Sequence, residues 1–326
     1  MTDHDDEMAA VIATSRIKAD DNLRKFADGF RRDTRRWVLS SEEADFLARI
    51  ATRRISGRAL LSNRHVRKAA HYALMEGLVD ASEDEPARQW LWITMAWDTG
   101  LTLERSPYID FVSLRTIAYQ HLRRSGIEGV GVVETDTWKN LTGEPGRRMA
   151  SHVHFIGYPA DGKRVKVTQV AADMRARAAL PNFLDAPSVD IQNVSGSPTD
   201  FAQIGQYMLK PPVHAKNPVM RRKGDRHKFY DAEHAQGSTA RLTEVFSHCE
   251  LGDVLFSIGG GTGKDIASKV RAAVRHEIRV RAGAMPAPTR EEVRRHWSSI
   301  RENNGSKKFC DCRIITRAEQ RGAEKS

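Results

Sequence analysis

Hydrophobic positions recur at helical spacing through the first part of the chain. Three segments carry apolar residues three or four positions apart with charged residues between them: residues 21–39, 40–55 and 62–79. Serine or asparagine stands at the start of the second and third segments, as is typical of helix N-caps. The pattern predicts a helical N-terminal region over residues 1–85. Short basic helices can bind DNA, but the pattern identifies no recognition helix, and ordinary helical packing explains it more simply.

The hydrophobic pattern changes after the acidic segment at residues 81–86. Short runs rich in β-branched and aromatic residues now alternate with amphipathic segments. The expected strands are residues 88–97, 128–138, 149–159 and 188–195, and the expected helices lie within residues 106–127, 161–180 and 197–210. Turn-forming residues separate the second and third strands, so these two strands should be antiparallel neighbours. The order β-α-β-β-α-β-α predicts an α+β fold, an antiparallel sheet core covered by helices and flanked by helical N- and C-terminal regions.

This pattern divides the chain into three expected regions, residues 1–85, 86–215 and 216–326. The third region begins with a basic connector that contains prolines. A short strand in "DVLFSI", a glycine-rich turn and a long basic helix near residues 265–282 follow it. The final forty residues carry little apolar periodicity, which is typical of partly disordered segments.

Charge is distributed unevenly along the 326 residues, whose net charge is +10. Residues 264–326 hold 16 Lys and Arg against 8 Asp and Glu, a net charge of +8. A basic surface of this kind favours polyanions, chiefly nucleic acid, although a solvated basic tail has the same composition. No apolar run approaches the length that crosses a bilayer, and the acidic first residues do not resemble a secretory signal, so we expect a cytoplasmic protein without membrane contact.

Cysteine usage agrees with a reducing compartment. The chain has three cysteines, Cys249, Cys310 and Cys312, an odd and sparse set that argues against a disulfide scaffold. Together with His248 they have ligand types that zinc accepts, but their spacing is not that of common zinc modules, so we expect reduced thiols.

The strongest candidate chemistry lies in the segment "SHVHFIGYP". On a strand, His152 and His154 project from the same face, because side chains alternate. Glu134 lies on the neighbouring strand and, with the turn centred near residue 143 or 144, falls opposite one of the two histidines. Two imidazoles and a carboxylate on one face suit a divalent cation. The alternatives are two structural histidines, a register slip of one residue, or Glu144 in the turn as the substitute ligand.

A second candidate lies in "YMLK". Tyr207 and Lys210 are three positions apart, so on a helix they share a face. Tyrosine is a poor nucleophile near neutral pH because its pKa is about 10, but a nearby cation or metal-bound phosphate helps it react as the phenolate. Taken singly, Tyr207 is also explained as a core aromatic and Lys210 as a cation at a helix C-terminus.

These motifs, in this order, resemble those of a known family. The stretches "WLWITMAWD", "GVVETDTW" with "SHVHF", and "VDIQNVS" with "QYMLK" resemble the HUH endonuclease domain of rolling-circle replication initiators, the Rep proteins of plasmids and phages. The resemblance covers residues 88–212, somewhat over a third of the chain. The chain has Val153 where family members often have proline. Gln203 and Pro211 stand where a second tyrosine one helical turn away would stand, so the resemblance is to single-tyrosine members.

The resemblance implies a replication initiator that nicks single-stranded origin DNA. In that reading His152, His154 and Glu134 hold Mg²⁺ or Mn²⁺, and Tyr207 attacks the phosphorus to leave a 5′-phosphotyrosine and a free 3′-OH. Lys210 would stabilise negative charge or lower the pKa of the tyrosine. No nucleotide cofactor is implied, and a host helicase and polymerase are the expected further partners. Alternatives are a single-tyrosine transposase, a relaxase-like nuclease, or a basic nucleic-acid-binding protein without enzymatic activity.

One competing motif is "SIGGGTGKD" at residues 257–265. A glycine-rich loop with a lysine between a strand and a helix suggests a phosphate-binding loop of the Walker A type. The pattern departs from that motif at Ile258 and at Asp265. We therefore expect a turn that caps the following helix at Asp265, and ATP hydrolysis dependent on Lys264 would indicate the alternative.

Overall fold

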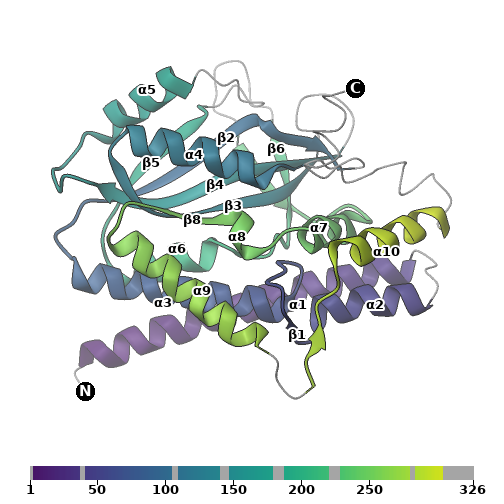
Figure 1. Ribbon diagram of the computed structural model, residues 1–326. Coiled ribbons are helices and arrows are strands. Elements are labelled where there is room, and N and C mark those ends of the chain that lie inside the picture. Colours follow the sequence, from purple (N-terminus) through teal and green to yellow (C-terminus); the bar gives the residue numbers. More distant parts are fainter. Residues whose placement is uncertain are drawn as a thin grey trace.

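A seven-stranded, mostly antiparallel sheet lies at the centre of the structure, with helices on both of its faces (Figure 1). The computed structural model describes residues 3–36, 41–104, 109–139, 147–178, 187–219, 228–279 and 283–303. The strands are β2 (Trp90–Leu103), β3 (Ile127–Lys139), β4 (Arg147–Pro159), β5 (Val189–Val194), β6 (Ala215–Val219), β7 (Lys228–Ala232) and β8 (Leu255–Ile258). Their order is β5-β2-β4-β3-β6-β7, and β8 pairs with β3.

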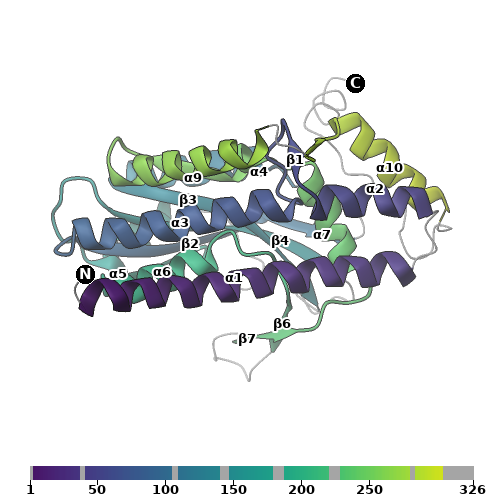
Figure 2. The same cartoon turned by 90° about the horizontal axis from the view of Figure 1, so that it is seen from below.

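Two helical layers enclose this sheet. Helices α4 (Phe111–Arg124) and α5 (Val167–Ala178) lie on one face. The other face carries α1 (Asp3–Arg36), α3 (Arg64–Asp84), α6 (Pro198–Tyr207) and α9 (Thr262–Ile278), of which α9, α3 and α1 run side by side in Figure 2. The remaining elements are α2 (Ser41–Thr52), α7 (Ser238–Ser247), α8 (Leu251–Val254), α10 (Arg290–Asn303), and the paired short strands β1 (Ile55–Ser56) and β9 (Met285–Pro286).

The structure confirms the α+β class and the order of elements between residues 88 and 212. Strands β3 and β4 pair antiparallel from Ile127 opposite Pro159 to Lys139 opposite Arg147. Val153 and Phe155 on one face and Ile156 on the other are all fully buried. Helices cover both faces, so apolar side chains are buried on each of them.

Several element ends differ from the sequence predictions. Strand β2 continues to Leu103, past an irregularity between Ala96 and Leu101. Helix α4 begins at Phe111, because the Asp110 carboxylate accepts a hydrogen bond from the Ser113 backbone N–H, 2.9 Å away, and caps the helix there.

The three regions expected from the sequence share one hydrophobic core. Phe30 from α1, Trp90 from β2 and Val270 from α9 all belong to it. Strand β8 completes part of the sheet by pairing with β3, and α9 packs along α3. The expected boundaries near residues 85 and 215 are therefore not breaks in the packing.

The C-terminal part of the chain contributes to this core. Within the last forty residues, where partial disorder is expected from the sequence, α10 is helical and buries Val293 and Trp297. Residues 304–326 lie outside the described part of the chain. None of the helices in the described ranges is long and apolar enough to cross a membrane.

The glycine-rich loop before α9 is a site of close packing. Helix α9 begins at Thr262, three residues before the predicted cap at Asp265, and Gly261 occupies the N-cap position. A Cβ on Gly263 would lie 2.3 Å from the backbone of Gly129 in β3, so only glycine fits at this contact. The Glu128 carboxylate lies against Gly259. A carboxylate at this position disfavours a bound phosphate.

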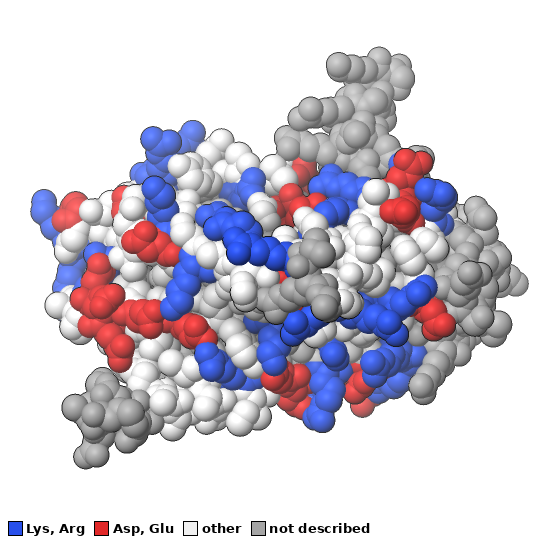
Figure 3. Space-filling model, turned by 60° about the horizontal axis from the view of Figure 1, so that its bottom comes forward, with Lys and Arg blue, Asp and Glu red and all other residues white. Residues whose placement is uncertain are grey.

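Basic side chains are prominent on the side of the molecule that carries α1, α3 and α9 (Figure 3). A hollow of about 500 Å³ between α1 and α3 has four basic side chains in its lining, which are Arg24, Arg54, Arg64 and Lys68. Acidic partners lie among them: Lys68 pairs with Asp20 at 2.7 Å. This surface is basic but partly neutralised.

Candidate active site

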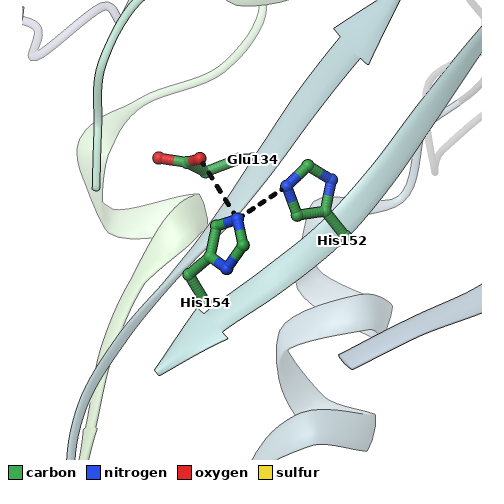
Figure 4. A group of neighbouring side chains, drawn as sticks. All are labelled: Glu134, His152 and His154. Carbon is green, nitrogen blue, oxygen red and sulfur yellow. Dashed lines mark hydrogen bonds and ion pairs between the residues drawn. The ribbon is translucent and has the colours of Figure 1, made fainter. Parts of the chain in front are cut away.

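Glu134, His152 and His154 come together on the sheet face that carries α6 (Figure 4). The β3–β4 register places Glu134 directly opposite His152, and His154 follows two residues later on the same face. One candidate ligand atom from each side chain lies within 4.8 Å of the other two. Among the described residues this is the one such group of His, Cys, Asp or Glu side chains.

The spacing of the donor atoms fits a divalent cation. The two histidine Nε2 atoms are 2.9 Å apart, and His154 Nε2 lies 3.7 Å from Glu134 Oε2. Two ligands bound at about 2.1 Å and at right angles are about 3 Å apart. The residues present therefore fit Mg²⁺ or Mn²⁺.

A second set of contacts orients two of the three candidate ligands. Thr94 Oγ1 lies 3.2 Å from His154 Nδ1, which leaves Nε2 directed at the site. The Leu209 backbone N–H donates to Glu134 Oε1, which leaves Oε2 on the histidine side. Contacts of this kind to the outer atoms of ligands are typical of metal sites, because they fix ring and carboxylate orientation.

The protonation of these ligands is governed by burial. Burial lowers the pKa of His152 and of His154, so both imidazoles are neutral near pH 7 and have a lone pair to offer. Burial, reinforced by the Asp136 carboxylate, raises the pKa of Glu134 to about 8. A cation that binds near neutral pH would therefore displace a proton from this carboxyl group.

The structure brings Tyr207 and Lys210 together, but not on one helix face. Helix α6 ends at Tyr207, so the predicted helix to Lys210 is wrong at its last turn. The chain then reverses through Leu209, which has a φ of 61° in the left-handed region. This turn carries Lys210 back over the tyrosine, with its Nζ 3.7 Å from the ring centroid.

Tyr207 borders the ligand group. Its ring centroid is 5.0 Å from that of His154, and Trp92 stacks on His154 at 4.9 Å with an interplanar angle of 16°. Tyr207 remains 37% exposed. Burial, with the carboxylates of Glu134 and Asp136, raises the pKa of Tyr207 above its ordinary value. This direction is opposite to the effect expected of Lys210.

His152, His154 and Tyr207 line one cavity of about 780 Å³. Its wall is built from β2, β3, β4, β5, α6 and β6. Sequence reasoning missed three charged residues there, Asp136, Asp200 and Lys216. Asp136 follows Glu134 by two positions in "ETD", a spacing that would have placed it on the same strand face. Lys216 had no local signal, since only the tertiary fold brings β6 to the cavity.

The remaining candidates lie elsewhere. Glu144, Cys310 and Cys312 fall outside the described residues. Cys249 is buried, and its thiol donates to the Glu250 backbone carbonyl at 3.7 Å.

Comparison with known proteins gives no relative. No protein-family model, no curated protein and no solved structure matches the chain.

Proposed function

We propose that this chain is a metal-dependent, single-tyrosine DNA strand-transfer endonuclease of the HUH type, acting as a rolling-circle replication initiator. The observation that carries the proposal is that Tyr207 lies beside the group formed by Glu134, His152 and His154, and lines one cavity with the two histidines. The order of strands and helices around these residues, and the histidine pair on the strand next to the glutamate strand, agree with the resemblance seen in the sequence.

In the proposed reaction, a phosphodiester of single-stranded DNA lies in the cavity. Glu134, His152 and His154 would hold Mg²⁺ or Mn²⁺, which supplies Lewis-acid polarisation of the scissile phosphate. The Tyr207 oxygen forms a bond to phosphorus, and the bond from phosphorus to the 3′-oxygen breaks. Tyr207 loses its proton and the departing 3′-oxygen gains one, so the products are a 5′-phosphotyrosine and a free 3′-OH.

The chain's own residues prepare this step. The raised pKa of Tyr207 disfavours its phenolate, and Lys210 on the face of the ring would offset part of this cost as the phenolate develops. Lys216 adds positive charge at the cavity wall, where DNA phosphates would pass. The aromatic side chains of Trp92 and Trp138 line the same cavity and suit contact with unpaired bases.

The proposed partner is single-stranded origin DNA. Basic side chains beyond the cavity, on the helical side shown in Figure 3, support a polyanionic partner. A host polymerase would extend the free 3′-OH that the reaction leaves, while a host helicase separates the strands, in the cytoplasm of the host.

The proposal is tested with a pool of single-stranded oligonucleotides of random sequence and Mn²⁺. A label at the 3′ end should stay with the protein through denaturing electrophoresis, whereas a label at the 5′ end should be released on a fragment that a polymerase extends. Excess chelator should prevent both results. Transfer of the 5′ label to the protein, or an adduct that persists in chelator, would contradict the proposed chemistry.

A further inference from the structure

We propose that Arg67 is a positioning residue of this site, which clamps the Leu209–Lys210 turn and thereby orients both Glu134 and Lys210. The role of Arg67 in the site rests on the proposed function. The contact between Arg67 and the Leu209–Lys210 turn can be tested without any catalytic activity. The sequence gives no sign of it, because Arg67 lies on α3, far along the chain from every candidate site residue.

Arg67 is a buried cation that donates hydrogen bonds to backbone carbonyls. It is 4% exposed, and its guanidinium lies over the Phe246 ring at 4.4 Å. Its Nε donates to the Leu61 carbonyl at 2.9 Å, and its Nη1 donates to the carbonyls of Leu209 and Lys210 at 3.4 and 3.5 Å. Burying a guanidinium costs free energy. A buried arginine that donates to two successive carbonyls therefore indicates that it fixes the conformation of that turn.

The turn that Arg67 contacts is held in an unfavourable conformation. Leu209 is the one non-glycine residue with positive φ among the described residues, and its side chain is buried. A strained backbone of this kind persists only where the surroundings fix it. Arg67 holds the carbonyl side of Leu209, and Glu134 accepts from its N–H, so the residue is fixed from both sides.

Two functional groups depend on this turn. The Leu209 N–H sets the Glu134 carboxylate with Oε2 toward the histidines. The next residue, Lys210, reaches back over Tyr207 because the chain reverses at Leu209. Without the guanidinium, the turn can relax to a negative φ, which would move the N–H away from Glu134 and Lys210 away from the tyrosine.

The test compares three substitutions at two buried arginines. Arg67→Lys keeps the charge but cannot bridge two carbonyls in the same way, and Arg67→Met removes the donor altogether. Arg241→Lys is the matched control, because Arg241 is equally buried but pairs with Glu244 on α7. Mn²⁺ is titrated calorimetrically into the metal-free full chain, without DNA, at a temperature where circular dichroism shows each variant folded.

We expect Arg67→Met to lower Mn²⁺ affinity by about 10- to 100-fold, the range typical of lost outer contacts to metal ligands. Arg67→Lys should lie between it and the wild type, Arg241→Lys should match the wild type, and amide exchange at Leu209 should accelerate only in the Arg67 variants. Should Arg67→Met fail to fold, Arg67→Lys alone decides. Wild-type Mn²⁺ affinity together with wild-type exchange at Leu209 in a folded Arg67 variant would overturn the inference. A wild-type chain that binds no Mn²⁺ would instead refute the proposed function, and the exchange at Leu209 would still test the clamp.

Discussion

At the scale of single residues, the candidate site depends on side chains removed from water. His154 is 4% exposed, and its two ring nitrogens face Thr94 on one side and the ligand group on the other. The environment fixes both the orientation and the charge of the imidazole. A substitution of His154 should therefore change the candidate site more than it changes the stability of the fold.

We predict that His152→Ala and His154→Ala each abolish metal-dependent cleavage and lower Mn²⁺ affinity by at least about 10-fold. The reason is that each would remove one of the three proposed metal ligands. His121→Ala on α4, across the sheet, is the control and should bind Mn²⁺ as the wild type does. Calorimetric titration measures the affinity, and unchanged affinity in both ligand variants would show that the histidines are structural.

A second prediction at this scale concerns His71 on α3, which is fully buried. Burial lowers the pKa of His71 to about 4, against an ordinary value near 6.5. Between these values the unfolded chain binds the proton and the folded chain does not, so stability falls as pH falls from about 6.5 toward 4.

From pH 7 to pH 5 the His71 contribution to this loss should be about 2 kcal/mol. The measurement is urea unfolding at both pH values for the wild type and His71→Leu, with the variant losing less stability. Equal losses in the two proteins would show that His71 does not titrate in this window.

At the scale of elements, close backbone contact decides where helices can lie. Gly263 allows the first turn of α9 to pack directly on Gly129. A Cβ added to Gly260, in the same loop, would meet no atom within 4 Å. Gly263→Ala should destabilise the fold by about 2 kcal/mol, as overpacking does in cores, and Gly260→Ala should be nearly neutral. Thermal unfolding compares the two. Similar melting temperatures for the two variants would mean that α9 can move away from β3 without loss of stability.

Local patterns predicted the strands and helices of residues 88–212 well, because alternation and amphipathic spacing are properties of neighbouring residues. The Glu134–His152 pairing could be anticipated from the length of the connecting turn. The end of α6, the reversal at Leu209 and the contact from Arg67 could not. Each of these depends on residues that only the tertiary fold brings together.

At the scale of the whole molecule, the C-terminal region is part of the fold up to Asn303. If residues 216–326 formed the separate region expected from the sequence, truncation after Gly263 would leave the site intact. The structure places α9 against α3 and buries Val270, Val274 and Trp297 beyond that point. Truncation there would remove nearly all of α9 and expose the core residues of α3, the helix that carries Arg67.

We therefore predict that truncation after Gly263 unfolds the chain, whereas truncation after Asn303 keeps every buried residue named above. The residues lost after Asn303 include six Lys or Arg and three Asp or Glu. Their removal should flatten the salt dependence of DNA binding, by about 0.7 log units per lost phosphate contact on single strands. Melting curves and binding titrations at several salt concentrations measure both effects. A stable chain ending at Gly263 would contradict the shared core.

The central claim is that Tyr207 becomes covalently linked to DNA. The most direct measurement is mass spectrometry of the adduct formed with single-stranded DNA and Mn²⁺, after digestion of the protein and trimming of the DNA. The nucleotide should be found on the peptide that contains Tyr207, and Tyr207→Phe should yield no adduct while still binding Mn²⁺. A nucleotide on another side chain, such as Tyr158, or an adduct at wild-type level in Tyr207→Phe, would contradict this assignment.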